Sequence, residues 1–245
     1  MQRHLFISLT ALIALAGTGC ASIDGPREPH DPWEGYNRAM HSFNDKVDRA
    51  VLKPTAKGYR AITPDPVEKG ISNFFSNLGE VKVIVNDLLQ FKLLHFLSDT
   101  GRLVTNSTLG IGGLFDVASH FGMKKHDEDF GQTLGRWGVG QGPYLVLPFL
   151  GPSSVRDGIG EYGDYFADPI REVDDRDHRL ALRALDIIDG RAQLLEAGEI
   201  VDEAAFDPYI FLREAYLQRR RYQVYDGDLP DIDDEQDDID IFSDE

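Results

Sequence analysis

The residue with the clearest chemistry is Cys20, the only cysteine in the chain. A basic start, an apolar run over residues 5–16 and the small residues 17–19 precede it. These three features together define a secretory signal and its cleavage site. A sole thiol at such a site has no partner for an intramolecular disulfide, so thioether attachment of lipid is its simplest use. We predict a signal peptide over residues 1–19, lipidation of Cys20 and a tether over residues 20–30.

A buried N-terminal helix is the alternative, but the apolar run shows no amphipathic pattern. The run is also shorter than the roughly 20 apolar residues that span a bilayer. Gly17 stands where lipoprotein signals usually have leucine, so the prediction depends on the remaining features. Ala21 follows the cysteine, whereas aspartate there usually retains a Gram-negative lipoprotein at the inner membrane. We therefore expect a lipid anchor in the outer membrane, facing the periplasm.

The rest of the sequence contains no recognisable catalytic constellation. Ser153 and Ser154 follow a proline and lack the context of a nucleophile elbow. Residues 110–113 read Gly-Ile-Gly-Gly, without the third glycine of a dinucleotide site, and no phosphate-binding loop is present. His120 and His126 are six positions apart and would not share a helix face. We expect a protein that is not an enzyme.

One short run has the residue types that bind metal ions. Residues 126–129 read His-Asp-Glu-Asp, and imidazole and carboxylate groups are common ligands. The alternative is a solvated acidic turn, which we favour because nothing else in the sequence supports a site. We expect no metal and no cofactor other than the covalent lipid on Cys20.

Charge is concentrated at the C-terminus. The formal net charge is −17, and residues 226–245 contain acidic side chains but no Lys or Arg. Such a protein should be repelled by nucleic acid. We predict a disordered acidic tail over residues 226–245, although its isoleucines could dock on a partner. The tail lacks the glycine and the terminal glutamate of an EF-hand calcium loop.

The predicted elements are helices. Asp-Pro occurs four times, and Asp suits the N-cap just as Pro suits the first helical position. The four aspartates are Asp31, Asp65, Asp168 and Asp207. Apolar side chains recur every three or four positions over residues 32–52, and again from Pro66 onward. Each stripe predicts a helix that faces either a protein core or a lipid interface.

Residues 81–97 are still more apolar, but charged side chains interrupt them and make a spanning helix unfavourable. We expect a central core helix or one embedded in a single leaflet. Residues 130–164 are rich in glycine and proline, which predicts a structured loop region with room for a short strand. Such a loop must be buried, line a passage or face lipid. Two helices, over 177–200 and 208–225, close the domain.

The last of these helices ends with three arginines, residues 219–221. They could complement the negative end of the helix dipole. They could also contact phosphate headgroups or the acidic tail.

Six stretches together carry a resemblance to a known family. They are DPWEGYNRAMHSFND (31–45), ISNFFSNLGE (71–80), NSTLGIGGLFDVA (106–118), DFGQTLGRWGVGQGPYLVLPFLGPSSVRD (129–157), RAQLL (191–195) and DPYIFLREAYLQR (207–219). The chain resembles the VacJ, or MlaA, lipoproteins, which bind phospholipid in the Gram-negative outer membrane. The stretches cover most of a domain that we place at residues 31–225.

The resemblance implies an all-α, ring-like body of amphipathic helices that lies within the inner leaflet of the outer membrane. A narrow amphipathic channel would pass phospholipids misplaced in the outer leaflet to a soluble periplasmic carrier protein. The family associates with trimeric outer-membrane porins, and an inner-membrane ATPase complex serves the same pathway. This transfer would maintain the lipid asymmetry of the outer membrane.

In this framework, the Gly/Pro-rich residues 130–152 should help to form or gate the channel. The aromatic residues that we expect to contact acyl chains are Phe43, Phe74, Phe75, Tyr144 and Phe149. Two alternatives stay open. The protein could be a structural lipoprotein that scaffolds a porin without moving lipid, or a lipid hydrolase with a nucleophile that the sequence does not reveal.

Overall fold

The computed structural model describes residues 29–229. The predicted signal peptide, Cys20 and nearly all of the tether and acidic tail lie outside the described residues. The regular elements within these residues are helical, apart from two short strands. The all-α prediction is therefore confirmed, with one added hairpin. Among the described residues, each helix is too short or too polar to cross a membrane.

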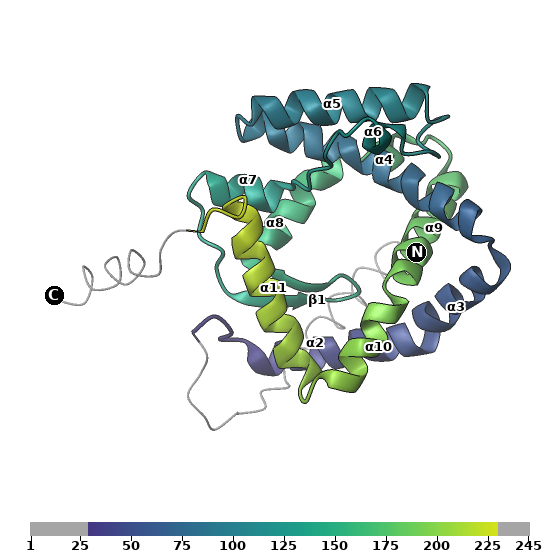
Figure 1. Cartoon of the computed structure of the whole chain (residues 1–245). Helices are drawn as coiled ribbons and strands as arrows, with labels where there is room; N and C mark the ends of the chain where they lie inside the picture. Colours follow the sequence, from purple (N-terminus) through teal and green to yellow (C-terminus); the bar gives the residue numbers. More distant parts are fainter. Residues whose placement is uncertain (1–28, 230–245) are drawn as a thin grey trace, which may run out of the picture.

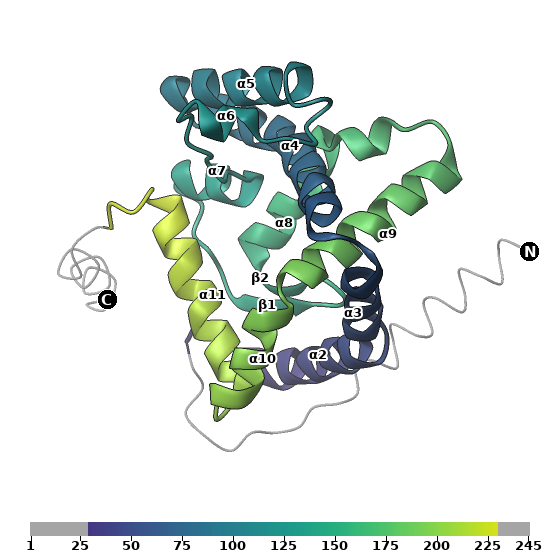
Figure 2. The same cartoon turned by 45° about the vertical axis from the view of Figure 1, so that its right-hand side comes forward.

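The elements are arranged as a ring, as the resemblance implied (Figure 1). Helix α2 (Glu34–Val47) forms the lower side and leads into α3 (Lys53–Ile62). Helix α4 (Asp65–Leu89) crosses the upper side, and α5 (Leu93–Thr108) lies on its outer face. Figure 2 shows α9 (Arg176–Gln193) descending beside α3 toward α10 (Leu195–Ala204).

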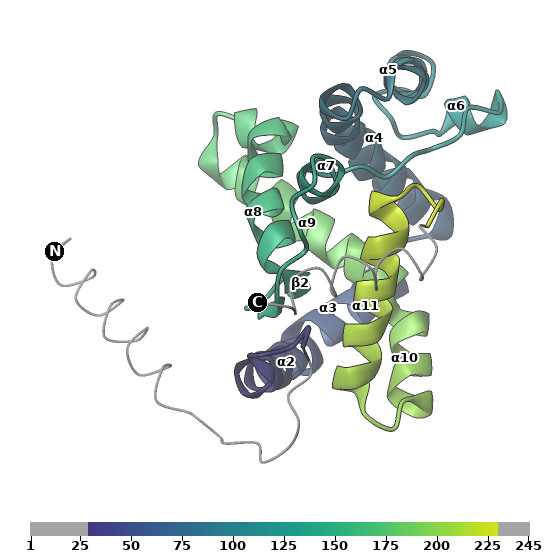
Figure 3. The ribbon, with the colours of Figure 1, turned by 90° about the vertical axis from the view of Figure 1, so that its left-hand side faces the viewer.

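On the other side of the ring, α7 (Phe130–Arg136) packs on α8 (Val155–Asp164). Helix α11 (Pro208–Val224) contacts both α7 and the β-hairpin. In the perpendicular view, α8 and α11 lie apart, with α7 above and between them (Figure 3). The hairpin in turn contacts α2, and these contacts close the ring.

The first helix is longer than its sequence pattern predicted. It does not end at Leu52, because a π-helical turn (Asp48–Leu52) joins α2 to α3 without a break. The cause is Pro54, which stands in the first turn of α3 and has no amide hydrogen for the ladder. A π turn accommodates this local loss of a hydrogen bond, whereas a continuous α-helix would place the proline ring against a carbonyl.

The prediction of one helix over residues 81–97 was wrong. Helix α4 ends at Leu89, the chain turns back through Gln90, Phe91 and Lys92, and α5 begins at Leu93. Phe91 has a φ of 60°, and the Lys92 amide donates to the Asp87 carbonyl at 2.9 Å. No glycine or proline marks this reversal in the sequence, so its position depends on the antiparallel packing of α5 along α4.

The prediction of a loop region with a strand was partly right. Strands β1 (Tyr144–Leu147) and β2 (Gly151–Ser154) pair antiparallel, but helices α7 and α8 flank them. Two caps start these helices: Asp129 accepts from the Gln132 amide and Ser154 from the Asp157 amide. The glycines serve helix packing here, because a Cβ on Gly160 would lie 2.4 Å from the Gly131 nitrogen.

The remaining elements are α6 (Val117–His120) and the 3-10 turns η2 (Tyr165–Ala167) and η3 (Pro169–Glu172). Two of the four Asp-Pro predictions are confirmed. Asp168 caps η3, and Asp207 caps α11. Asp65 instead lies inside the first turn of α4, where its charge still suits the helix dipole. Asp31 does not cap a helix; its side chain is buried and forms other hydrogen bonds.

Asp31 and Asn37 connect three elements of the ring. Asn37 donates to Asp31 at 2.8 Å and to the Tyr144 carbonyl at 3.0 Å, and its own oxygen accepts from the Val146 amide at 2.8 Å. Arg213 of α11 donates to Asp31 at 3.1 Å. Both Asp31 and Asn37 are buried, so these bonds join α2, β1 and α11 away from solvent.

We expect Asn37→Ala to lower the free energy of unfolding by about 2–4 kcal/mol, since it leaves buried donors and acceptors unpaired. Denaturant unfolding of the detergent-solubilised protein measures this loss. The control is Asn73→Ala, which removes one exposed hydrogen bond to the Leu114 carbonyl and should cost about 1 kcal/mol or less. Equal losses from the two variants would contradict the assigned role of Asn37.

Candidate functional site

The buried side chains of this protein are unusually polar. Among the described residues, 21 polar or charged side chains are buried, against only 10 hydrophobic ones. Charged residues are almost never fully buried in soluble proteins unless they are paired. At the same time, large apolar side chains are exposed around the whole molecule. This distribution fits a protein whose surroundings are themselves apolar.

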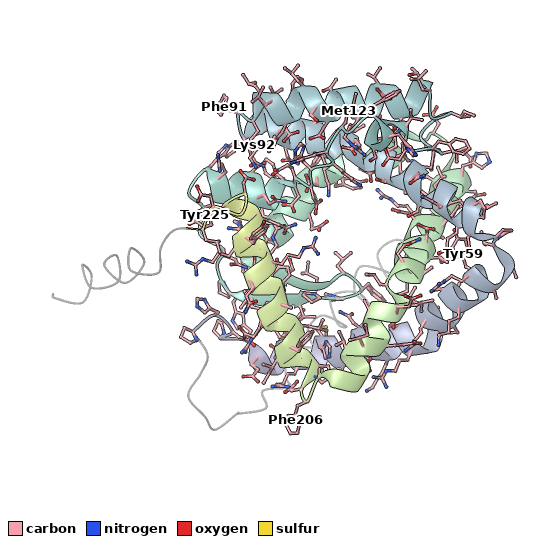
Figure 4. The ribbon with its side chains drawn as sticks, in the orientation of Figure 1. Tyr59, Phe91, Lys92, Met123, Phe206 and Tyr225 are labelled. Atoms are coloured by element: carbon pink, nitrogen blue, oxygen red, sulfur yellow. The ribbon has the colours of Figure 1, made fainter. Side chains whose placement is uncertain are left out.

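Two highly exposed apolar side chains lie at the turn between α4 and α5. Phe91 is 84% exposed and Leu94 is 82% exposed. Phe91 lies at the outer edge of the ring in Figure 4. Further exposed apolar residues follow along α5 and the loop after it: Leu97, Val104, Leu109, Ile111, Phe115 and Phe121.

Other apolar side chains are exposed at separate places on the ring. Phe149 and Leu150 form the tip of the β-hairpin, and Phe149 is 71% exposed. Ile159 and Tyr162 are exposed on α8. Phe206, before α11, is at the lower edge in Figure 4. The apolar surface therefore surrounds the ring instead of forming one patch.

A buried arginine joins α4, α5 and α6. Arg102 on α5 is 1% exposed, and its guanidinium lies 3.3 Å from both the Glu80 and the Asp116 carboxylates. It also donates to the Ser119 hydroxyl at 3.2 Å and to the Met123 carbonyl at 2.6 Å. The donors of the guanidinium group thus bond to groups on α4, on α6 and in the segment after α6.

A second arginine joins α7, α8 and α11. Arg220 makes paired hydrogen bonds to Asp129, at 2.5 and 2.9 Å, and to Asp157, at 3.0 and 2.8 Å. Burial alone would raise the pKa of both carboxyls, but the Arg220 guanidinium holds each pKa below its usual value. This arginine was expected to face the helix dipole, headgroups or the tail, and that prediction was wrong for Arg220.

A chain of side-chain hydrogen bonds joins α4 to α7 and α8. The Asn86 amide donates to Asp164 at 2.8 Å, and the Thr133 hydroxyl donates to the Asn86 oxygen at 2.7 Å. Gln90 donates to Thr133 at 3.1 Å, and Asp164 accepts from the Phe130 amide. Polar side chains therefore take part in each of these three joints, at Arg102, at Arg220 and at Asn86.

The structure brings the predicted lipid-contact residues together in pairs. Phe43 and Phe149 meet edge-to-face with ring centroids 5.2 Å apart, and Phe74 and Phe75 do so at 5.3 Å. Tyr144 is separate and 1% exposed, because it packs against Tyr209 and Tyr216. The first four side chains are at least partly accessible, whereas Tyr144 belongs to a core cluster.

Phe75 also lines a cavity of about 290 Å³ between α4, α8 and α9. Leu78 and Ile170 add apolar wall, and Lys82 and Arg183 bring positive charge to it. Arg183 forms an ion pair with Asp168, and further acidic residues complete the lining: Glu161, Asp164 and Asp186. The cavity is amphipathic, with a volume at the lower end of small-molecule pockets.

A model of the MlaA lipoprotein family matches residues 29–223. The chain belongs to the MlaA lipoprotein family. It is 37% identical over 230 residues to the intermembrane phospholipid transport system lipoprotein MlaA of Escherichia coli (strain K12), covering 92% of this chain and 91% of that protein. The Haemophilus influenzae protein of the same description is 34% identical over 90% of this chain and 91% of its own length.

The fold matches an MlaA-family structure as well. A solved chain described under the structural basis for maintenance of bacterial outer membrane lipid asymmetry aligns with a TM-score of 0.69 and 37% identity. The alignment covers 81% of this chain and all of the solved one. The MlaA resemblance that the sequence motifs indicated is therefore confirmed.

The run of residues 126–129 differs from the solvated acidic turn that we favoured. In this MlaA-family chain, Asp127 is exposed, but Glu128 is buried and Asp129 is held by Arg220. Sequence spacing could not reveal this, because the partners of Glu128 are Gln90 and Lys92 from the α4–α5 turn.

We expect Arg102→Met to destabilise the protein by about 3–5 kcal/mol, because the Glu80 carboxylate then loses its buried cation. Burial already raises the pKa of Glu80. The matched control is Arg60→Met, which removes an exposed pair with Glu196 and should cost less than about 1 kcal/mol. Denaturant unfolding midpoints compare the two, and a similar small loss from both would contradict the role of Arg102.

The same network predicts an acid transition. Burial alone would raise the pKa of Asp116, but hydrogen bonds from Ser119, then Asn106, and the charge of Arg102 lower it to about 2. A pKa below the unfolded value of about 3.9 stabilises the fold above that pH, and the contribution is lost as the pH falls toward 2. Asp116→Asn should therefore flatten the fall in unfolding free energy between about pH 4 and pH 2. Parallel curves for variant and wild type would contradict this.

Proposed function

We propose that this protein is a non-enzymatic lipoprotein of the outer membrane that moves phospholipid between membranes and thereby maintains outer-membrane lipid asymmetry. Membership of the MlaA lipoprotein family supports the proposal, as do relatives described as intermembrane phospholipid transport lipoproteins. The similarity to a structure described under outer membrane lipid asymmetry supports the proposed role in that membrane.

The observation that carries the proposal is the inverted polarity of the ring. Apolar side chains outside can contact acyl chains, while the polar groups inside are mostly satisfied by one another. Backbone and side-chain polar groups must be paired internally when the surroundings are lipid. The ring therefore suits a position in one leaflet, with its helices lying in the membrane plane.

The amphipathic cavity next to Phe75 is our candidate for a lipid contact. Its apolar side chains can contact an acyl chain, and its charged groups, four carboxylates with Lys82 and Arg183, can contact a headgroup that carries charges of both signs. A volume of about 290 Å³ admits a headgroup or a section of an acyl chain. Phe43, Phe74 and Phe149 remain further candidates for acyl contact, since all three are at least partly accessible.

We further propose the partners of the transfer. A trimeric outer-membrane porin would contact part of the exposed apolar surface, and a periplasmic carrier protein would receive the lipid. Exposed apolar surface that surrounds the whole ring, from Phe91 to Phe206, leaves room for both lipid and a membrane-protein neighbour.

The experiment compares two glycine variants. Gly79 lines the cavity, whereas Gly58 on α3 does not, and a Cβ at either position meets nothing within 4 Å. We expect Gly79→Leu to fill the cavity without disturbing α4, and Gly58→Leu to serve as the matched control. Gly79→Leu should reduce the phospholipid that co-purifies in mild detergent, measured by mass spectrometry, and raise outer-leaflet phospholipid in cells, measured with an amine-reactive label.

The alternative of a porin scaffold predicts another outcome. A wild-type protein that binds porin but carries no phospholipid would refute transport. Two variants that both behave as the wild type would refute the cavity as the lipid contact while leaving the family function intact. Loss of lipid from Gly79→Leu but not from Gly58→Leu would support both lipid transport and the cavity as the lipid contact.

A further inference from the structure

A cluster of potential metal ligands lies beside the α4–α5 turn, and none of its residues lines the cavity next to Phe75. One ligand atom each from Asp87, His95 and Glu128 lies within 4.8 Å of the others. They come from α4, α5 and the segment before α7, so three parts of the chain meet here. Lys92, at the same turn, is labelled on the upper left of the ring in Figure 4.

Two carboxylates at this site, Asp87 of the cluster and the neighbouring Asp99, are buried without sufficient partners. Asp87 is 0% exposed, and neither of its oxygens accepts a hydrogen bond from a described group. Asp99 is also 0% exposed, and its Oδ1 lacks a partner. Buried carboxylates are nearly always hydrogen-bonded or paired with a cation, because desolvation of an unpaired charge is costly. Asp87 also contacts the carboxyl of Asp99, so this buried pair needs either a shared proton or a cation.

The nearby cation does not supply that charge. Lys92 donates to Glu128 at 2.7 Å and also pairs with Asp226, so its ammonium is shared between two other carboxylates. Gln90 satisfies the second oxygen of Glu128 at 2.8 Å, but it is neutral. Lys92 is therefore bonded elsewhere, and both oxygens of Asp87 stay without a hydrogen-bond donor among the described groups.

Two histidines lie side by side at this site. His95 and His126 stack with ring centroids 3.9 Å apart. His126 Nδ1 lies 2.7 Å from Asp99 Oδ2, the kind of carboxylate contact that orients a histidine near a metal. The Nδ1 of His95 has no hydrogen-bond partner among described groups.

We propose that Asp87, His95 and Glu128 bind a divalent transition-metal ion, with zinc the best match. One imidazole nitrogen and two carboxylate oxygens are ordinary zinc ligands, at about 2.0–2.2 Å from the ion. In a tetrahedral site, the ligand atoms are therefore about 3.4 Å apart. His95 Nδ1 lies 4.0 Å from Asp87 Oδ1, and the imidazole is 38% exposed, so a small shift of its side chain closes the difference.

The ion would act structurally. It would join the α4–α5 turn to the segment that leads into α7, and so fix the position of the exposed Phe91 and Leu94. It would also neutralise the buried carboxylates without protonation. The inference is independent of phospholipid transport, because it depends only on these side chains.

The test measures zinc in the full-length lipoprotein, extracted in mild detergent with any affinity tag removed. The protein is treated with a chelator, dialysed against zinc chloride and then against buffer, and analysed by inductively coupled plasma mass spectrometry. We expect stoichiometric zinc in the wild type. Asp87→Asn and His95→Gln should each weaken zinc binding by at least about tenfold, as loss of even an outer-shell partner does.

The matched control is His178→Gln, which alters an exposed His–Asp pair on α9. It should retain the zinc of the wild type. Zinc should also raise the unfolding temperature of the wild type and of His178→Gln, but not that of Asp87→Asn. Asp87→Asn should fold, since it removes a buried charge and keeps the shape of the side chain; far-UV circular dichroism checks this.

Three results would overturn the proposal. The first is a wild type that retains no zinc above the buffer level. The second is a folded Asp87→Asn or His95→Gln protein that binds zinc as tightly as the wild type. The third is zinc loss from His178→Gln equal to that from Asp87→Asn, which would indicate binding to surface histidines in general.

Discussion

The whole structure depends on one constraint: polar groups that are buried between the elements of the ring must form hydrogen bonds or ion pairs with one another. Arg102 and Arg220 each hold two carboxylates, and Asn37 and Asn86 use both ends of their amides. Each of these side chains connects segments that are far apart in the sequence. Buried networks of this kind specify a geometry, because a shift of one element would leave charged groups unpaired.

The same constraint explains why the apolar residues are outside. In the part of the chain that the structure describes, hydrophobic burial occurs in small clusters, such as Ala56, Ala192 and Leu195 between α3, α9 and α10. In water, the exposed Phe91 and Leu94 would favour aggregation. In a leaflet, lipid tails are as apolar as leucine, so these side chains gain nothing by packing on one another. The elements are then held together by hydrogen bonds and ion pairs.

Local signals in the sequence predicted much of the fold. The stripes of α2 and α4, the Asp207 cap and the hairpin strand follow from spacing and turn chemistry. The sequence could not reveal the reversal at Phe91 or the burial of Asp31, because both depend on partners from other elements. The candidate site was less predictable still. Of the five predicted aromatic residues, only Phe75 lines the cavity. No periodicity shows that Asn37 bonds to β1 or that Arg220 bonds to Asp129.

Close packing of helices at glycine residues helps to stabilise the ring, in which hydrophobic burial is limited. Gly131 and Gly160 let α7 and α8 approach until a Cβ on Gly160 would lie 2.4 Å from backbone nitrogen. Small residues at helix contacts are typical of proteins in lipid, where dispersion and hydrogen bonds replace the hydrophobic effect between helices. Arg220 then spans the α7–α8 contact from α11, and bonds to Asp129 and Asp157 on both helices. The glycine-rich sequence of this region therefore encodes a close contact between α7 and α8 that Arg220 ties to α11 by hydrogen bonds.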